Sequence, residues 1–311
     1  VKVSNATLVS NASEGTCIEG TGSIALTNCT LKATNNKLNG NATFYDTVMI
    51  YQSMSGDANS GTSSFTMTGG KLISGNGHTF HVTNTNAVIN LENVDITNSS
   101  DNVFISVCDD GWSGGSNIAT LNAASQDISG AVLVGSDSQL TMNLTDGSYF
   151  EGYTSGNITN GKGTSVSSLI GTLKMTLGSG CTWKLTGDSY VTSISGAGSI
   201  DYNGYTLYVN GKAYTEDSPY SGISAVDTDD NDNSETETAD EQENAAEPET
   251  SDKPEDSVEP EASDIPEKPE EMTVPEKPED NESPAEQEEI NIPGESEKAA
   301  EHVRTTDLQI T

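Results

Sequence analysis

The chain has 311 residues, with 13 Lys and Arg against 48 Asp and Glu, and a formal net charge of -35. Such a charge argues against nucleic-acid binding, because neutralising phosphates needs clustered Lys and Arg. No apolar run approaches the roughly 20 residues that span a bilayer, so we expect no membrane insertion. The four cysteines are scattered without a CxxC pair, which argues against a zinc site.

The composition changes near residue 220. Residues 1–222 hold 8 Lys and 17 Asp+Glu, a net of -9, whereas residues 223–311 hold 5 Lys+Arg and 31 Asp+Glu, a net of -26. We predict a folded domain over residues 1–220 and a disordered, Pro/Glu-rich acidic tail over residues 221–311, because the tail has too few apolar residues to form a core. The tail is interpreted as a solvated spacer, or alternatively as an acidic arm for a cationic partner.

An imperfect repeat runs through the first 220 residues: an apolar-x-apolar segment, a polar or Gly corner, and another apolar position. Its clearest copy is Ile89-Asn90-Leu91-Glu92-Asn93-Val94-Asp95-Ile96. The copies start at Ile24, Phe65 and Ile89, with looser copies near Ile118, Leu140 and Leu173. Period-two alternation predicts strands, and most of the spacings suit one coil of a β-solenoid. The longest spacing, 41 residues from position 24 to position 65, leaves room for two coils or an inserted loop.

The corner of the repeat and the C-terminal end of the folded domain also contain turn-forming residues. Asn28 and Asn93 occupy the same corner of the repeat, so stacked coils are expected to align their amides in a hydrogen-bonded ladder. Two Asn-Gly pairs, Asn203-Gly204 and Asn210-Gly211, each predict a β-hairpin. We therefore expect a C-terminal cap at about residues 199–215, which would cover the last coil.

Some segments resemble a known superfamily. Residues 77–85, running into 89–96, together with 188–192 and 203–211, resemble the pectate-lyase-like right-handed parallel β-helix superfamily. They look most like uncharacterised secreted or surface β-helix proteins of anaerobic Gram-positive bacteria. The resemblance is one of pattern and spans roughly residues 60–215.

The resemblance implies an all-β fold: a right-handed parallel β-helix (solenoid) with a C-terminal β-hairpin cap, here followed by the disordered acidic tail. The handedness comes from the resemblance alone. Members of the superfamily include polysaccharide lyases, glycoside hydrolases, carbohydrate-binding modules and adhesin passengers. The resemblance also implies a secreted or cell-surface location.

Asp109-Asp110 is the most site-like cluster. Polygalacturonase-type members of the superfamily have an adjacent Asp pair and a Gly-His-Gly segment, but here Gly77-His78 precedes the Asp pair and the arginine-lysine motif is missing. A pectate lyase needs a Lys or Arg base, and Arg304 lies in the tail. The pair is therefore interpreted as a solvated loop or as a weak calcium site formed by Asp109 and Asp110. We expect no other cofactor.

His78 and His81 are three residues apart, which in a strand predicts opposite faces and no shared metal. No Gly-x-Ser-x-Gly elbow accompanies a plausible His and Asp partner, so a hydrolase triad is not predicted. Cys17 and Cys29 would form a local disulfide in an exported chain. The alternative, which we favour, is a free, buried Cys29.

Aromatic residues are the other candidate binding groups. Trp112, Tyr202 and Tyr205 are candidate platforms on which sugar faces would stack. Trp183 is instead expected to pack under the cap.

We predict a non-catalytic secreted or cell-surface module for adhesion or carbohydrate binding. We expect it to act as a monomer on a polysaccharide or surface glycan. The alternatives are a polysaccharide-active enzyme on an acidic glycan, similar to a pectate lyase or polygalacturonase, and a rigid spacer without a ligand.

Overall fold

The computed structural model describes residues 1–38, 40–111, 116–223 and 309–310. These residues form strands and turns without a helix, so the prediction of an all-β chain is confirmed. Within these ranges there is accordingly no helix long and apolar enough to cross a membrane. The predicted tail, residues 221–311, lies outside the described residues except for 221–223 and 309–310.

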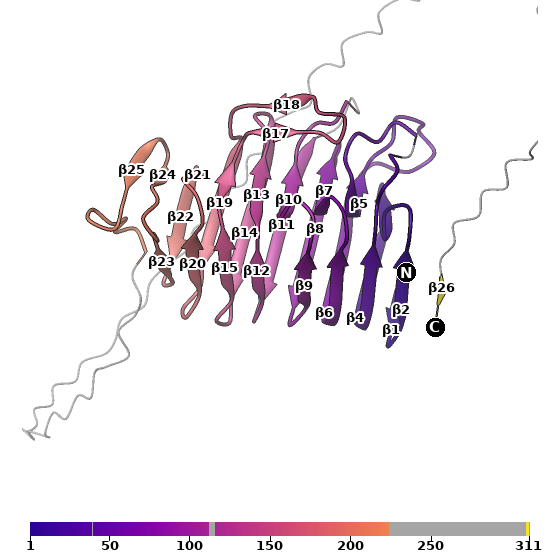
Figure 1. The fold of residues 1–311 in the computed structure, drawn as a ribbon, viewed down its shortest axis with the longest axis horizontal. Coiled ribbons are helices and arrows are strands. Elements are labelled where there is room, and N and C mark those ends of the chain that lie inside the picture. The colour runs from indigo at the N-terminus through magenta and orange to yellow at the C-terminus, as the bar shows by residue number, and fades with distance from the viewer. Residues whose placement is uncertain (39, 112–115, 224–308, 311) are drawn as a thin grey trace, which may run out of the picture. The chain divides into compact units, whose positions relative to one another are not determined.

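The largest sheet, which we call sheet A, is parallel except at one edge (Figure 1). In spatial order its strands are β22 (Ser193–Gly196), β19 (Thr172–Leu177), β14 (Ser138–Thr145), β11 (Asn117–Ala124), β8 (Thr85–Glu92), β6 (Thr62–Ser74), β4 (Ser23–Ala33), β2 (Thr7–Ser10) and β26 (Gln309–Ile310). β1 (Lys2–Ser4) also pairs with β4, and β9 (Asp95–Asn98) with β6. The short β26 pairs antiparallel with β2.

Two further sheets are parallel throughout. Sheet B contains β16 (Thr154–Ser155), β13 (Ala131–Val134), β10 (Val103–Val107), β7 (His78–Thr83), β5 (Asp46–Tyr51) and β3 (Thr16–Glu19). Sheet C contains β12 (Asp127–Ser129), β15 (Tyr149–Gly152), β20 (Thr182–Leu185) and β23 (Ser199–Asp201). A smaller sheet contains β21 (Ser189–Val191), β24 (Leu207–Val209) and β25 (Lys212–Tyr214). A separate hairpin joins β17 (Ile158–Thr159) to β18 (Ser165–Ser167).

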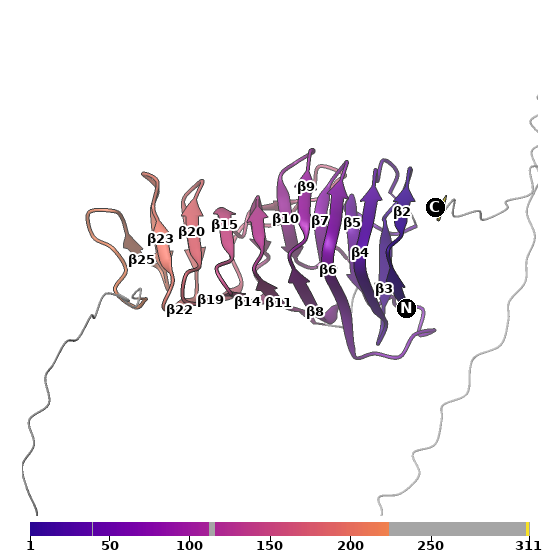
Figure 2. The same cartoon turned by 90° about the horizontal axis from the view of Figure 1, so that it is seen from below.

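The chain visits the sheets in a recurring order. From β11 to β19 it passes from sheet A to sheet C to sheet B and back to sheet A, as in β11, β12, β13 and β14. After β19 the sheet of β21, β24 and β25 takes the place of sheet B. Each such passage, which we call a repeat, pairs with the one before it. The repeats lie side by side in a row that has β2 near one end and β25 at the other (Figure 2).

The pairing register tests the predicted repeats directly. Ile24, Phe65 and Ile89 are in register, so the 41-residue spacing is one repeat with inserted segments and not two. The copy near Ile118 is displaced, because Leu121 is the residue paired with Ile89, and Ile118 points outward. Leu140 pairs with Leu173, as the spacing predicted.

The predicted corner at Asn28 and Asn93 is confirmed. Both residues have positive φ, 51° and 52°, and so has Gly69, at 63°, in the repeat between them. The predicted hydrogen-bonded ladder between the two amides is not formed there, because Gly69 separates them. A Cβ atom at Gly69 would lie 2.6 Å from Oδ1 of Asn28, so a larger residue there would displace that amide and would also adopt an unfavourable positive φ.

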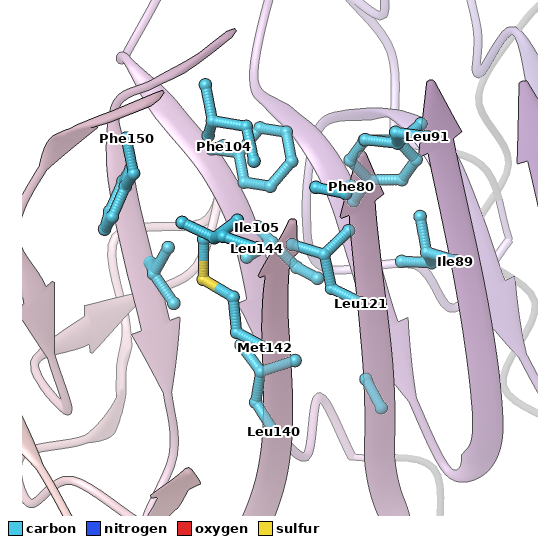
Figure 3. Packing of buried hydrophobic residues seen from close by; sticks show 14 of the residues in the cluster. Phe80, Ile89, Leu91, Phe104, Ile105, Leu121, Leu140, Met142, Leu144 and Phe150 are labelled. Carbon is cyan, nitrogen blue, oxygen red and sulfur yellow. The ribbon is translucent and has the colours of Figure 1, made fainter. Parts of the chain in front are cut away.

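The core fills the space between the sheets with rows of apolar side chains. Phe65 and Phe80 meet edge to face with their centroids 5.5 Å apart, and Phe80 meets Phe104 in the same way at 5.5 Å. Figure 3 shows Phe80 and Phe104, with Ile89 and Leu121 projecting into the same interior. Since every repeat adds residues to one continuous core, each repeat is stabilised by its neighbours.

The C-terminal end differs in part from the prediction. Asn210-Gly211 joins the antiparallel strands β24 and β25, so this hairpin is confirmed. The predicted hairpin at Asn203-Gly204 is wrong. The flanking strands β23 and β24 pair in parallel with the preceding repeat, and the two residues form a corner. The last repeat is instead covered by β25 and by Tyr220, whose hydroxyl donates to the Ile194 carbonyl.

Substitutions at the corner should separate backbone strain from lost contacts. We expect Asn93→Ala to lower the free energy of unfolding by about 1 kcal/mol, because alanine resists positive φ. Gly69→Ala should cost more, since its Cβ also collides with Asn28. Asn93→Gly is the matched control and should stay near wild type. Urea unfolding measures all three, and a Gly69→Ala variant as stable as wild type would contradict this account of the corner.

Candidate functional site

The structure separates the two predicted calcium ligands. Asp109 is exposed, and its Oδ1 accepts the Gly111 N–H at 2.8 Å. Asp110 is buried: its Oδ1 accepts from the Thr83 hydroxyl at 3.2 Å, and its Oδ2 lies 3.5 Å from Nε2 of His81. The two carboxylates therefore do not face one another. The calcium site stays a prediction that this geometry does not support.

The predicted aromatic platforms differ in their exposure to solvent. Tyr202 is only 6% exposed and its hydroxyl accepts the Tyr220 N–H, so its ring is not open to a ligand. Tyr205 is exposed, and Trp112 lies outside the described residues. Trp183 is fully buried and stacks on Phe150, as the packing interpretation expected.

A second tyrosine pair was not singled out from the sequence. Tyr190 and Tyr208 are in register on β21 and β24, with centroids 4.7 Å apart and planes 7° apart. At that separation the rings lie face to face, so each covers one face of the other. The pair is better suited to stiffening this end of the body than to forming a flat platform.

The densest cluster of chemically competent groups lies on the outer face of sheet B. Ser106, on β10, has its Oγ 2.7 Å from Nδ1 of His78 and 2.8 Å from Nδ1 of His81. Nε2 of His78 lies 3.5 Å from Asp101, and Nε2 of His81 lies 3.5 Å from Asp110. The arrangement is a chain of carboxylate, imidazole, hydroxyl, imidazole and carboxylate.

This cluster corrects the prediction that His78 and His81 lie on opposite faces. Both rings contact the same serine hydroxyl. His78 is the first residue of β7 and follows Gly77, whose φ is 76°. Regular strand alternation does not extend across such a corner, so a spacing of three does not fix the two faces. The sequence offered no signal for Ser106, because its partners come from a different repeat.

Two inserted segments cover the cluster. Phe44, in the connection between β4 and β5, stacks on His81 with a centroid separation of 4.3 Å and also contacts His78. Ile158 of β17 packs in the same apolar group as Phe44. The two segments are joined where the Gly161 N–H donates to the Thr43 carbonyl at 2.7 Å. We call residues 34–38, 40–45 and 156–171 the cover.

The serine bridge constrains where the protons lie. One hydroxyl has one proton, so Ser106 donates to one imidazole, and the other imidazole donates its Nδ1–H to Ser106. We infer that the two histidines hold different tautomers when both are neutral. The one with Nδ1–H presents a bare Nε2 to its carboxyl group, an arrangement that is stable when that carboxyl is protonated.

Burial sets the charge of this region. Burial, and to a lesser degree the neighbouring His81, lowers the pKa of His78 to about 3. Burial raises the pKa of Asp101, and raises that of Asp46 well above its usual value, helped there by the charges of Glu14 and Asp110. His78 is therefore neutral at neutral pH.

The cluster has the residue types of a serine hydrolase triad but not its access. Ser106 is completely buried beneath the cover, so its hydroxyl cannot meet a substrate in this arrangement. Within the described ranges, no three or more His, Cys, Asp and Glu residues are arranged to hold a metal ion. All four cysteines are free, and Cys29 is buried as expected. The geometry makes the cluster a support for the cover.

The outer face of sheet A is the other extended polar feature. We call it the amide face. It comprises Ser64, Thr66 and Thr68 of β6, Val88, Asn90 and Glu92 of β8, Thr120, Asn122 and Ala124 of β11, and Thr141, Asn143 and Thr145 of β14. These residues alternate with buried ones along each strand, so they point away from the core.

A hydrogen-bonded row runs down the middle of the amide face. Asn143 Nδ2 donates to Asn122 Oδ1 at 2.9 Å, Asn122 Nδ2 to Asn90 Oδ1 at 2.9 Å, and Asn90 Nδ2 to the Thr66 hydroxyl at 3.2 Å. We call these four residues the amide row. They are in register on four adjacent strands. This is the kind of ladder that the sequence predicted, but at different asparagines.

Comparison with known proteins gives no further assignment. No protein-family model, no curated protein and no solved structure matches this chain. The candidate site therefore stands on its own geometry.

Removing the central hydroxyl tests the cluster under the cover. We expect Ser106→Ala to lower the free energy of unfolding by about 1–3 kcal/mol, because it leaves buried imidazole nitrogens without partners. Ser129→Ala, on the exposed edge of β12, is the control and should change little. Chemical denaturation gives the comparison, and equal effects of the two substitutions would contradict the bridging role.

The buried histidine predicts a defined pH dependence. The pKa of His78 is lowered from 6.5 to about 3, so below pH 6.5 the unfolded chain binds more protons and the folded state loses stability. We expect the contribution of His78 to fall by about 2 kcal/mol between neutral pH and pH 5. Asp46 and Asp101, whose pKa values are raised, act in the opposite direction, so the readout must isolate His78.

The comparison is therefore between wild type and His78→Gln across pH 7 to 5. The carboxyl contributions are common to both proteins, so the difference between the two stability curves reports the histidine. Wild type should lose stability faster than the variant as the pH falls. Parallel curves would show that His78 is not held neutral by the fold.

Proposed function

We propose that this chain is a right-handed parallel β-helix that binds a neutral glycan, without chemical conversion, through the amide face. Support for the fold comes from the long parallel sheets and the recurring passage through them. The handedness rests on the resemblance drawn from the sequence. A secreted or cell-surface location is part of the same proposal.

The amide row is the observation that carries the binding proposal. Its four side chains are held by hydrogen bonds to one another, so a ligand does not have to immobilise them. Each amide has two N–H donors and two acceptor lone pairs, and the row uses only one of each on Asn122. The row thus presents fixed donors and acceptors at regular intervals.

The composition of the face favours a polyhydroxylated ligand. The amide face has no aromatic side chain, so a ligand there would be held by hydrogen bonds and not by the ring stacking expected at aromatic platforms. Hydroxyl and amide groups dominate it, and the rows on either side of the amide row contribute Ser64, Thr120 and Thr141 on one side and Thr68 and Thr145 on the other. Such groups exchange hydrogen bonds with sugar hydroxyls.

Charge argues against an acidic glycan. Residues 1–222 carry a net charge of -9, and Glu92 is the one charged side chain of the amide face. A polyanion such as pectin would be repelled over the range of a Debye length. Two-carboxylate hydrolysis needs a pair of acidic groups flanking the bond, and this face has one. These points favour binding over the enzymatic alternative.

A substitution within the amide row tests the proposal. Wild type should bind immobilised neutral polysaccharides such as cellulose, xylan or chitin, and should not bind polygalacturonate. Asn122→Val should weaken that binding about tenfold or more, because it removes hydrogen bonds on both sides of the row and on the ligand. Affinity electrophoresis or a glycan array gives the measurement.

The matched control is Thr182→Val on the outer face of sheet C, where Thr182 is hydrogen-bonded to Ser199 in the same way but away from the amide face. This variant should bind like wild type. Release of sugar products would favour the enzyme alternative. Absence of binding to every glycan tested would leave the spacer interpretation.

A further inference from the structure

We propose that the bound glycan lies along the amide row, across the strands, with about one sugar residue for each repeat. The proposal rests on the proposed glycan binding and adds the class and direction of the ligand: a linear, neutral, equatorially linked polysaccharide in an extended form. The observation that carries it is the direction of the row itself.

The row sets a repeat length. Its members are in register on adjacent parallel strands, so they are spaced by the distance between strands, about 4.8 Å. A pyranose residue in an extended, equatorially linked chain is about as long as that spacing. A ligand lying across the strands therefore places one sugar beside each amide, with alternate sugars presenting opposite edges to the row because successive rings of such a chain are turned over. A ligand lying along a strand would meet residues of changing type.

The row also has a direction. Every amide in it donates toward the β6 end, from Asn143 to Asn122 to Asn90 to Thr66. Asn90 and Asn122, the two residues inside the row, therefore both donate toward β6 and accept from the side of β14. A polysaccharide chain has a reducing and a non-reducing end, so such a row favours one orientation of the chain over the other.

The ends of the row limit the length of the ligand. On the β4 side the next position in register is Ala25, which has no polar group. On the β19 side it is Thr176, which has a hydroxyl but no amide. The pattern therefore continues for four to five repeats. Beyond that length, additional sugar residues find no further equivalent partner.

The flanking rows suit the same ligand in part. Thr120 and Thr141 lie beside Asn122 and Asn143 on one side, and Thr145 lies beside Asn143 on the other. These hydroxyls repeat at the same interval as the amides because they share the register. A sugar chain along the row therefore meets hydroxyls beside Asn122 and Asn143 on one edge, whereas Val88 interrupts that flanking row and Glu92 and Ala124 interrupt the other.

A length series tests the inference. Cello-, xylo- and chito-oligosaccharides of two to eight residues are titrated into the full-length protein, with calorimetry as the readout. We expect at least one series in which each added residue raises the association constant about fivefold, until a plateau at four to five residues. Thr66→Val, which removes the end of the row, should shorten the plateau by one residue.

Asn122→Val should lower the plateau further, because it divides the row. Thr182→Val on sheet C should leave the whole series unchanged. Affinity that keeps rising to eight residues, or a plateau that Thr66→Val does not shift, would overturn the lengthwise arrangement while leaving glycan binding intact. Failure of every oligosaccharide and polysaccharide to bind would instead overturn the proposed function itself.

Discussion

In-register parallel pairing between successive repeats is the constraint from which the other features of the structure follow. Each residue of a sheet strand lies beside the equivalent residue of the repeat before it, as Ile89 lies beside Phe65 and Leu121. Equivalent positions therefore become rows. Apolar positions become continuous rows of core side chains, corner positions become rows of positive-φ residues, and outward polar positions become rows of amides and hydroxyls. A change at one position acts on two neighbours.

The same constraint explains why the corners accept so few residues. Asn28, Gly69 and Asn93 each turn the chain at the same level, and each has positive φ. A side chain at Gly69 would occupy the space of the Asn28 amide, so the amide ladder that a corner row would otherwise form is interrupted. On the flat sheet, where φ is extended, Asn90, Asn122 and Asn143 meet no such obstacle and their amides pair.

Local signals predicted the fold, and non-local register decided the sites. Period-two alternation around Ile89 was enough to predict strands, and the spacing of the repeat copies was enough to predict that they stack as a solenoid. The amide row was not predictable in the same way, because Asn90, Asn122 and Asn143 are separated by 32 and 21 residues, and connections of unequal length hide the alignment. Ser106 escaped notice for the same reason, since its two imidazole partners belong to the previous repeat. Asn203-Gly204 shows the converse limit: a local turn signal does not say whether the next strand returns antiparallel or continues into another sheet.

The Ser106 cluster and the amide row differ in burial, charge and hydrogen bonding. The Ser106 cluster is closed beneath Phe44, its His78 is held neutral, and two of its atoms, His81 Nε2 and Asp110 Oδ2, are buried without a hydrogen-bond partner. Such a cluster is stable only while the cover excludes water and charge, which makes it a poor place for a ligand to enter. The amide row is half-buried, neutral and already hydrogen-bonded, so it remains ordered whether or not a ligand is present. An open, preorganised surface that neither gains charge nor rearranges on contact is suited to repeated, reversible association. That physical difference is why we propose a binding role for sheet A and not for the histidines.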